Sequence, residues 1–384
     1  MDIRDHKHIL VCGDNRNSLS ILRSLHAGGV TPIVIMLKEG HIELLSKSKY
    51  IGEVRYTTDL DIVVDELLKH ANTTSSSSRP FVYLTDDNHL QVIDTHYNQL
   101  KDNFYFFNAG EQGRITRYLS KQQQCILAEK CGLNVPKFEE VERGQLPITL
   151  QYPVITKTYN SYSAGWKRDV TICNTPEELL ASYEHMVSER LLLQEYVVKT
   201  GELYLQGISI NGGEDVYIPF EARYLNYTKT TFGWYSVYKP FHNHELFVKL
   251  RSMLKEIHFS GCFEIEFLID EKNELHFLEI NMRFSGANYG VFLGGVNMPC
   301  LWAKATLENK IDRSTIQLRK EAYYVTNDEK GLPMITQMRF RDWLRPFLQT
   351  DGFYVYNKED KRPFYHWLWE TIKKTFRHKV LRKR

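Results

Sequence analysis

Acidic and amide side chains interrupt two apolar runs in residues 262–283, and this segment constrains the fold more than any other. The runs at 263–269 and 275–280 flank a polar turn at 270–273, which is the pattern of a β-hairpin. A carboxylate among core residues costs free energy unless a cation or hydrogen-bond donors neutralise it. Oxygen ligands on two paired strands suit Mg²⁺, which usually takes one or two carboxylates together with substrate phosphates. The candidates are Glu264, Glu266, Glu279 and Asn281, although Glu264 on an alternating strand could simply face water.

The composition is that of an ordinary globular protein, with 42% hydrophobic and 25% charged residues. Its 384 residues allow two or three domains, and no apolar run approaches the ~20 residues that span a bilayer. The N-terminus lacks the charged and apolar regions of a signal peptide, and the six cysteines form no Cys-x-x-Cys pair. We therefore expect a cytoplasmic protein with reduced thiols.

The charge is distributed unevenly along the chain. Residues 373–384 contain seven lysines and arginines and no acid, so the remainder carries −5 of a net charge of +2. A body of that sign disfavours a nucleic-acid-binding core, and we expect no nucleic-acid partner. Apolar residues precede and interleave with these basic residues, which is typical of an amphipathic helix: they are Trp367, Trp369, Ile372, Phe376 and Val380. Residues 366–384 therefore either contact the inner face of an anionic membrane peripherally or pack on their own domain.

Short apolar runs alternate with helical patterns in the first third of the chain. The runs lie at 8–13, 32–37, 54–57, 81–84 and 104–107, which predicts a doubly wound, parallel α/β sheet. The turn after the first run lacks a Gly-x-Gly-x-x-Gly pattern, so we do not predict a dinucleotide site there. The predicted domain ranges are 1–113, 114–192, 193–330 and an aromatic and basic extension at 331–384.

Several polar residues lie between this region and the hairpin in an order that suits a nucleotide. Lys121 begins a predicted helix, and Lys157 ends a strand that leads into a small polar loop with Ser163 and then Lys167. An apolar strand edge at 191–198 and a carboxylate, Glu202, follow. Lysines can neutralise a polyphosphate, loop amides can close over it, a strand edge can bind adenine, and a carboxylate can bind the ribose hydroxyls.

This order resembles the ATP-grasp superfamily over about residues 115–310. Thirteen positions after Glu266 the chain reads Glu-x-Asn-x-Arg at 279–283, an ending that is similar to biotin-carboxylase-like and carbamoyl-phosphate-synthase-like members. Two features depart from the family: Ser120 stands where Asp is usual, and the loop after Lys157 has a single glycine. The resemblance implies an α/β protein with a pre-ATP-grasp domain and two ATP-grasp subdomains that hold the nucleotide between them.

The resemblance also implies a set of site residues. It assigns ATP to Lys121, Lys157, Ser163, Lys167, Gln194, Glu195, Val197 and Glu202, and Mg²⁺ (or Mn²⁺) to Glu266, Glu279 and Asn281. Arg283 is the candidate donor to a tetrahedral oxyanion, with a salt bridge inside the metal site as its alternative role. Arg223, and with less support Lys229, are candidates to face the substrate.

The activity that the resemblance implies is ATP-dependent ligation of a carboxylate to an amine through an acyl phosphate. The partners would be a small-molecule, sugar or peptide carboxylate and an amine, with an amino acid, peptide or sugar acid of a cell-surface polymer as the expected acid. A homodimer is expected by analogy. The alternatives are an ATP-grasp enzyme that passes an acyl or carboxy phosphate to a non-amine acceptor, and a non-catalytic nucleotide-binding protein.

Overall fold

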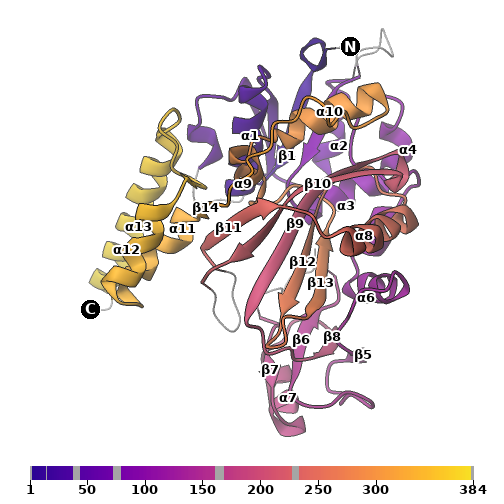
Figure 1. Ribbon diagram of the computed structural model, residues 1–384, viewed down its shortest axis with the longest axis vertical. Coiled ribbons are helices and arrows are strands. Elements are labelled where there is room, and N and C mark those ends of the chain that lie inside the picture. Colours follow the sequence, from indigo (N-terminus) through magenta and orange to yellow (C-terminus); the bar gives the residue numbers. More distant parts are fainter. Residues whose placement is uncertain are drawn as a thin grey trace.

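The computed structural model describes residues 2–13, 15–37, 44–71, 79–160, 168–226 and 233–381, with the backbone alone for 374–381 (Figure 1). Three predicted site residues, Ser163, Lys167 and Lys229, lie outside the described residues. Among the described residues, no helix has both the length and the apolar character of a membrane-spanning segment.

The N-terminal region is built on a parallel four-stranded sheet, as predicted. Its strand order is β3-β2-β1-β4, made of β1 (His8–Cys12), β2 (Ile33–Leu37), β3 (Glu53–Thr57) and β4 (Phe81–Leu84). The helices of this region are α1 (Arg16–Ala27), α2 (Ile62–Leu68), α3 (Asp87–Thr95) and α4 (Tyr97–Leu100). Asn15 and Asp86 begin α1 and α3 by accepting backbone N–H groups of the first turn, which fixes both helix starts at the carboxyl end of the sheet.

The prediction of a strand at 104–107 is wrong. Tyr105 forms a single parallel bridge with Phe81, and Asn108 forms an isolated antiparallel bridge with Ser260. Phe104, Phe106 and Phe107 are buried, so the apolar run serves core packing rather than a continued ladder.

A second, antiparallel sheet has the strand order β5-β8-β6-β7. It contains β5 (Phe138–Glu142), β6 (Val154–Thr158), β7 (Ile172–Cys173) and β8 (Arg190–Glu195), with α5 (Arg114–Tyr118) and α6 (Lys121–Lys130) before it and α7 (Pro176–Ser182) between β7 and β8. Buried residues of these strands and of α7 form a hydrophobic core that is separate from the main core of the molecule.

The third sheet has seven strands in the order β13-β12-β9-β10-β11-β14-β15. They are β9 (Gly201–Ile210), β10 (Asp215–Tyr224), β11 (Tyr235–Pro240), β12 (Gly261–Ile269), β13 (Leu275–Asn281), β14 (Tyr323–Thr326) and β15 (Gly352–Phe353). The predicted hairpin is confirmed, since β12 and β13 pair antiparallel with Ile265 opposite Ile280. The helices α8 (His244–Ile257), α9 (Asn288–Leu293) and α10 (Met298–Glu308) belong to this region.

The C-terminal segment packs on the rest of the molecule. It contains α11 (Asp328–Gly331), α12 (Phe340–Gln349) and α13 (Arg362–Leu381), and β15 pairs with β14 of the large sheet. A buried ion pair joins Arg23 of α1 to Asp360, with Nε and Oδ2 3.3 Å apart. Trp367 of α13 is buried in the main core, whereas Trp369 is largely exposed. The domain ranges expected from the sequence stay a prediction.

Candidate active site

The hairpin brings the predicted metal ligands onto one face of the large sheet. In the β12–β13 register, Glu264 lies opposite Asn281 and Glu266 lies opposite Glu279. Because residues two apart on a strand share a face, all four side chains project to the same side. The Asn281 Nδ2 group donates to Glu266 Oε1 at 3.1 Å and to Glu279 Oε1 at 3.4 Å. Three oxygen-bearing side chains are thus in mutual contact.

The carboxyl groups on this face differ in their affinity for protons. Burial raises the pKa of Glu266 well above its usual range, and the negative charges of Glu279 and Glu264 add to that effect. Burial also raises the pKa of Glu264, although the Ser285 hydroxyl donates to it. At Glu279 burial alone would raise the pKa, but the charges of nearby lysines outweigh it and lower that pKa. Acidic groups gathered in this way offer a strong site for a cation.

Two lysines approach Glu279 from outside its own sheet. Lys121 is the first residue of α6, which begins at the N-cap Ser120, and its Nζ lies 3.5 Å from Glu279 Oε2. Lys157 lies on β6 of the second sheet and donates to Gln194 Oε1 at 2.6 Å. Burial and the charge of Lys121 lower the pKa of Lys157 to about 8. Two ammonium groups from separate elements therefore converge beside the carboxylates.

The strand edge expected at 191–198 is wrong for β8, which lies between β5 and β6 within the second sheet, so only the segment after Glu195 can offer backbone groups to a ligand. The Gln194 amide accepts from Lys157 and donates to the Pro136 carbonyl at 3.2 Å, so its side chain positions that lysine. The Glu195 N–H donates to the Lys137 carbonyl at 2.9 Å. Within the described residues, the N–H of Val197 has no protein acceptor. A ligand with a hydrogen-bond acceptor could pair with it.

Glu202 provides a buried carboxylate oxygen that has no protein partner. It lies on β9 opposite Leu268 and is only 6% exposed. Its Oε1 forms an ion pair with Lys199, whereas its Oε2 is buried and has no hydrogen bond among the described residues. Burial raises the pKa of this carboxyl group. A buried polar atom without a partner costs free energy, which a ligand hydroxyl could recover.

Arg283 links the hairpin to the N-terminal region. Its Nε donates to Asp87 Oδ1 at 2.9 Å and its Nη2 donates to Asp87 Oδ2 at 3.3 Å. The same Nη2 donates to Asn281 Oδ1 at 3.1 Å. Burial would lower the pKa of Arg283, but the Asp87 carboxylate raises it, so the guanidinium is firmly charged. The side chain therefore orients a predicted metal ligand.

Arg223 lies apart from these residues, contrary to the expectation that it faces the site. On β10 it pairs with Leu203, which alternates with Glu202 and Tyr204 on β9 and so projects to the opposite face of the sheet. Its guanidinium is about half exposed, and its ion pair is with Glu221 at 3.7 Å. The sheet register, which the sequence did not provide, decides this placement.

Residues that the sequence did not indicate also lie near the carboxylates. Burial and the charge of Arg16 lower the pKa of Lys330 on α11 to about 8, while Glu202 and Glu266 act in the opposite direction. Burial raises the pKa of Tyr224 well above its usual range, and the nearby Glu266 carboxylate adds to that effect. The Tyr354 hydroxyl contacts the Tyr238 hydroxyl at 3.0 Å. Lys330 and Tyr354 reach this position because β14 and β15 pair with the large sheet, and no local sequence pattern predicts that pairing.

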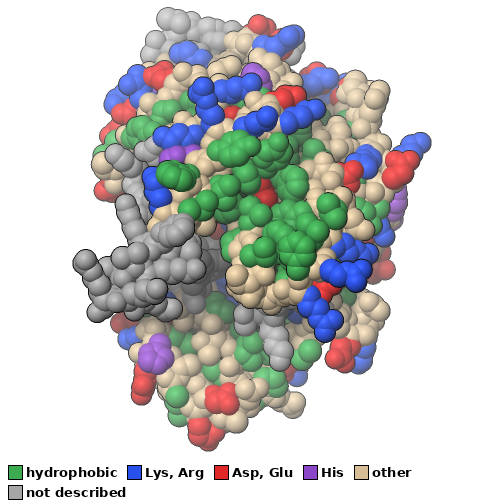
Figure 2. Space-filling view, turned by 90° about the vertical axis from the view of Figure 1, so that its left-hand side faces the viewer, with side chains coloured by type: hydrophobic (Ala, Val, Ile, Leu, Met, Phe, Trp, Pro, Cys, Tyr) green, Lys and Arg blue, Asp and Glu red, His purple; other side chains and the backbone are tan. Residues whose placement is uncertain are grey.

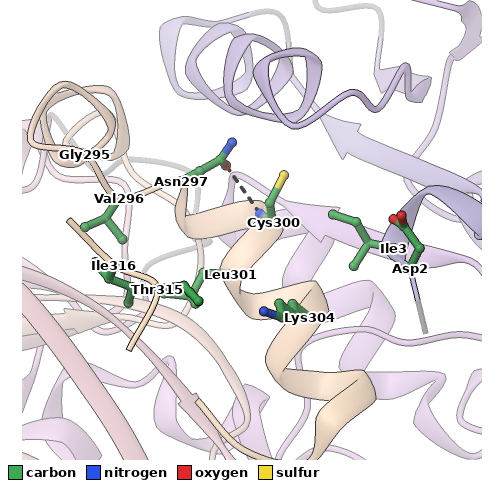
Figure 3. Close-up of a pocket in the computed structure, with 10 residues that line it drawn as sticks. All are labelled: Asp2, Ile3, Gly295, Val296, Asn297, Cys300, Leu301, Lys304, Thr315 and Ile316. Carbon is green, nitrogen blue, oxygen red and sulfur yellow. Dashed lines mark hydrogen bonds between the residues drawn. The ribbon is translucent and has the colours of Figure 1, made fainter. Parts of the chain in front are cut away.

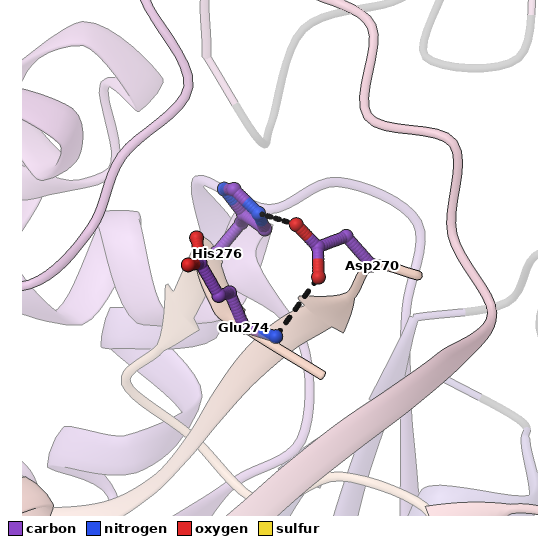
Figure 4. Close-up of side chains that lie close together, drawn as sticks. All are labelled: Asp270, Glu274 and His276. Atoms are coloured by element: carbon purple, nitrogen blue, oxygen red, sulfur yellow. Dashed lines mark hydrogen bonds and ion pairs between the residues drawn. The ribbon is translucent and has the colours of Figure 1, made fainter. Parts of the chain in front are cut away.

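A second cluster of acidic and histidine side chains closes the turn of the hairpin (Figure 4). Ligand atoms of Asp270, Glu274 and His276 lie within 4.8 Å of one another. Asp270 Oδ1 accepts the backbone N–H groups of Lys272 and Glu274, each at 2.9 Å, and Oδ2 contacts His276 Nε2 at 3.0 Å. These contacts account for the cluster as a hydrogen-bonded turn.

A pocket of about 490 Å³ lies elsewhere, between the N-terminal turn and α10 (Figure 3). Its lining includes Ile3, Cys300 and Lys304, and it contains none of the predicted site residues. Burial raises the pKa of the Cys300 thiol to about 12, so this sulfur is a poor nucleophile.

Comparison with known proteins assigns the fold. A family model described as ATP-grasp in the biosynthetic pathway with Ter operon matches residues 236–330. No match was found among curated protein sequences.

Solved structures with this fold cover most of the chain. N5-carboxyaminoimidazole synthetase from Staphylococcus aureus is 15% identical, with a TM-score of 0.65 over 88% of this chain and 87% of that chain. L-amino acid ligase from Bacillus licheniformis is 13% identical, with a TM-score of 0.62 over 87% and 85%. The biotin carboxylase domain of the 2-oxoglutarate carboxylase from Hydrogenobacter thermophilus, solved with MgADP and bicarbonate, is 18% identical, with a TM-score of 0.61 over 83% and 73%. At these identities the likeness establishes the fold.

Proposed function

We propose that the chain is an ATP-grasp enzyme, an ATP- and Mg²⁺-dependent ligase that joins a carboxylate to an amine, because a family model of that kind matches residues 236–330 and ligases share its fold. The observation that carries this proposal is the convergence on one sheet face of the Glu266–Glu279–Asn281 cluster with Lys121. Such a face suits a metal-bound polyphosphate, because the acids need a cation and the lysines need an anion.

The residues fit the groups that the reaction needs. The buried and unpaired Glu202 Oε2 fits a ribose hydroxyl, and the Val197 N–H fits an acceptor nitrogen of adenine. The proposed roles are Glu266, Glu279 and Asn281 for Mg²⁺ (or Mn²⁺), Lys121, Lys157, Ser163 and Lys167 for the phosphates, and Gln194, Glu195, Val197 and Glu202 for the nucleoside. Bound Mg²⁺ would offset negative charge on the phosphates.

The proposed reaction has two covalent steps. An oxygen of the substrate carboxylate attacks the γ-phosphorus of ATP, the bond from that phosphorus to the bridging oxygen breaks, and ADP leaves. The amine nitrogen then attacks the acyl carbon, the bond from that carbon to the phosphate oxygen breaks, and the nitrogen loses a proton. Lys121 and Lys157 stabilise the transferring phosphoryl group through their charge.

The contacts of Arg283 favour one of its two proposed roles. Its bonds to Asp87 and Asn281 use most of its N–H groups within the protein. We propose that Arg283 is a positioning residue that holds Asn281, rather than the donor to the oxyanion. Arg223 has no proposed role at the reacting atoms, since its strand position directs it to the other face.

The substrate acid is proposed to approach between the N-terminal region and α11. Arg16 lies there, with Nη1 3.0 Å from Glu329 Oε2, and Lys330 lies near Glu202 and Glu266. Two cationic side chains favour an anionic substrate. We propose an amino acid, a peptide or a sugar acid, in keeping with the name of the L-amino acid ligase that shares the fold. A cytoplasmic location, a homodimer and a cell-surface polymer as the source of the acid stay proposals.

Phosphate release from ATP tests the ligase directly. Amino acids, sugar acids, short peptides and bicarbonate are supplied singly and in pairs with amines. The ligase predicts stimulation only by an acid together with an amine, and its loss in Glu279→Gln. Stimulation by an acid or bicarbonate with a non-amine acceptor would favour passage of the phosphate-activated acid to that acceptor instead. No stimulation by any pair, in a protein that binds ATP, would favour a non-catalytic nucleotide-binding protein.

A further inference from the structure

Apolar side chains stand exposed on the two long helices of the C-terminal segment. The exposed fractions are 59% for Phe340 and 74% for Leu348 on α12, and 58% for Trp369 on α13. Tyr365 and Ile372 of α13 and Ile335, just before α12, are exposed as well. Figure 2 faces the side of the molecule that carries these helices and shows hydrophobic side chains gathered into one broad patch. We refer to these six residues as the α12–α13 face.

The face is held in place by the protein interior. Aromatic contacts run from Phe347 of α12 through Phe353 and Tyr356 to Phe364 of α13. Trp367, on the other side of α13, is buried in the main core. The exposed side chains therefore belong to an ordered surface, and they are the apolar residues left over after the helices have packed.

Basic side chains surround this face. Exposed arginines at 339, 341 and 345 accompany α12, and Lys361 and Arg362 begin α13. Residues 331–373 hold seven lysines and arginines against five acids, and residues 374–384 add six basic residues and no acid, which gives the whole segment a formal charge of +8. Figure 2 likewise shows blue lysine and arginine atoms at the border of the patch.

We propose that the α12–α13 face docks on an anionic lipid bilayer. Tryptophan, phenylalanine and leucine side chains would enter the interfacial region, and the surrounding arginines and lysines would meet lipid phosphates. A second copy of this chain is a poorer occupant, because the basic border of the face would meet its own like charge across a two-fold axis. The proposal goes beyond ligase chemistry and does not depend on it.

Docking would bring the proposed active site near the membrane. The segment that carries the α12–α13 face also supplies Lys330 and Tyr354, which lie near the carboxylates of the large sheet.

Vesicle flotation of the full-length protein tests this proposal. Vesicles of phosphatidylcholine alone are compared with vesicles that also contain phosphatidylglycerol, at low and high salt. The probes are Leu348→Glu and Trp369→Glu, and the matched control is Val248→Glu, which changes an exposed apolar residue of α8 in the same way. All three sites are more than half exposed, so we expect unchanged unfolding temperatures.

The expected result is binding to phosphatidylglycerol vesicles that weakens with salt, falls by about tenfold in each probe variant and is unchanged in the control. Three results would overturn the proposal. The first is no preference for phosphatidylglycerol vesicles. The second is equal binding by the probe and control variants, because vesicle binding would then be explained by the basic residues at 374–384 alone and not by the α12–α13 face. The third is a dimer that dissociates in Leu348→Glu without any vesicle binding, which would assign the face to self-association.

Discussion

The side chain of Glu279 connects the hairpin with the lysines. Its Oε1 accepts from Asn281 and its Oε2 lies 3.5 Å from Lys121 Nζ, so one carboxylate contacts both kinds of group. The nearby positive charges keep this carboxyl group ionised although burial opposes it. Glu266, its cross-strand neighbour, has the opposite pKa shift. The pair thus combines one strongly held negative charge with one that needs a cation to ionise.

Glu279→Gln tests this assignment. We expect loss of Mg²⁺-dependent phosphate release by at least about 100-fold, since even residues that only support metal ligands cost 10–100-fold. Turnover is measured against Mg²⁺ concentration, and unfolding temperature checks that the fold is kept. The control is Glu274→Gln, an exposed acid in the turn of the same hairpin. Turnover like that of the wild type in Glu279→Gln would contradict the metal assignment.

The pKa of Lys157, near 8, predicts a pH dependence of nucleotide binding. The ammonium is charged below that pH and neutral above it, so ATP affinity should be highest below about pH 7. It should then fall as the pH rises through 8, by up to about tenfold per pH unit. Equilibrium titrations across this range measure it. Lys157→Arg should remove the dependence because arginine stays charged, whereas Lys330→Met, at a second lysine with a lowered pKa, should retain it. A flat profile in the wild type would contradict the role of Lys157.

The helix α9 approaches strand β11 of the large sheet closely at Gly290. A Cβ on Gly290 would lie 2.1 Å from the Tyr238 ring, so only glycine allows this approach. The Tyr238 hydroxyl in turn contacts the hydroxyls of Tyr204 and Tyr354, at 3.2 and 3.0 Å. These three hydroxyl groups link β9, β11 and the C-terminal segment on the face of the large sheet that carries the carboxylates.

Gly290→Ala should therefore destabilise the protein by about 1–3 kcal/mol, because the buried Tyr238 ring has to move. Urea denaturation measures the change in the free energy of unfolding. Gly13→Ala is the control, since its new Cβ would meet its nearest neighbour at an ordinary 3.4 Å. Equal free energies of unfolding for the two variants would show that α9 can move away from Tyr238 without destabilising the protein.

Local sequence patterns predicted most of the helices and strands, and they also indicated most of the acidic and basic residues that lie in the candidate site. Apolar runs around a polar turn predicted β12 and β13, and their register then brought Glu266 and Glu279 together. Long-range pairing accounts for what the sequence did not predict. The apolar run at 104–107 packs in the core, and only the β9–β10 register directs Arg223 to the other face. Lys330 follows β14, which pairs with β11 in the same sheet that carries the hairpin, and this long-range pairing places Lys330 near the carboxylates.

The C-terminal segment contacts both the N-terminal region and the large sheet. Asp360 accepts from Arg23 of α1 and from Ser48, whose hydroxyl lies 2.8 Å from Oδ2. Both charged partners are almost fully buried, at 3% and 1% exposed. The basic segment is thereby anchored to the N-terminal region and not only to its own sheet.

Asp360→Ala should cost about 3–5 kcal/mol, because it leaves the Arg23 guanidinium buried without its counter-charge. Thermal unfolding measures the loss, and Glu245→Ala, which removes a surface ion pair with Lys249, should leave the unfolding temperature nearly unchanged. A small loss in Asp360→Ala would mean that the segment is held by its aromatic contacts alone.

Transfer of an oxygen atom from the substrate carboxylate to phosphate distinguishes activation through an acyl phosphate from other uses of ATP. An acid that stimulates turnover is labelled with ¹⁸O in its carboxylate and incubated with the protein, Mg²⁺, ATP and the amine, and the released phosphate is analysed by mass spectrometry. Activation of the acid as an acyl phosphate predicts one ¹⁸O atom in each phosphate released with the ligated product. Unlabelled phosphate would contradict the proposed reaction, because it would mean that the carboxylate never attacks the γ-phosphorus of ATP.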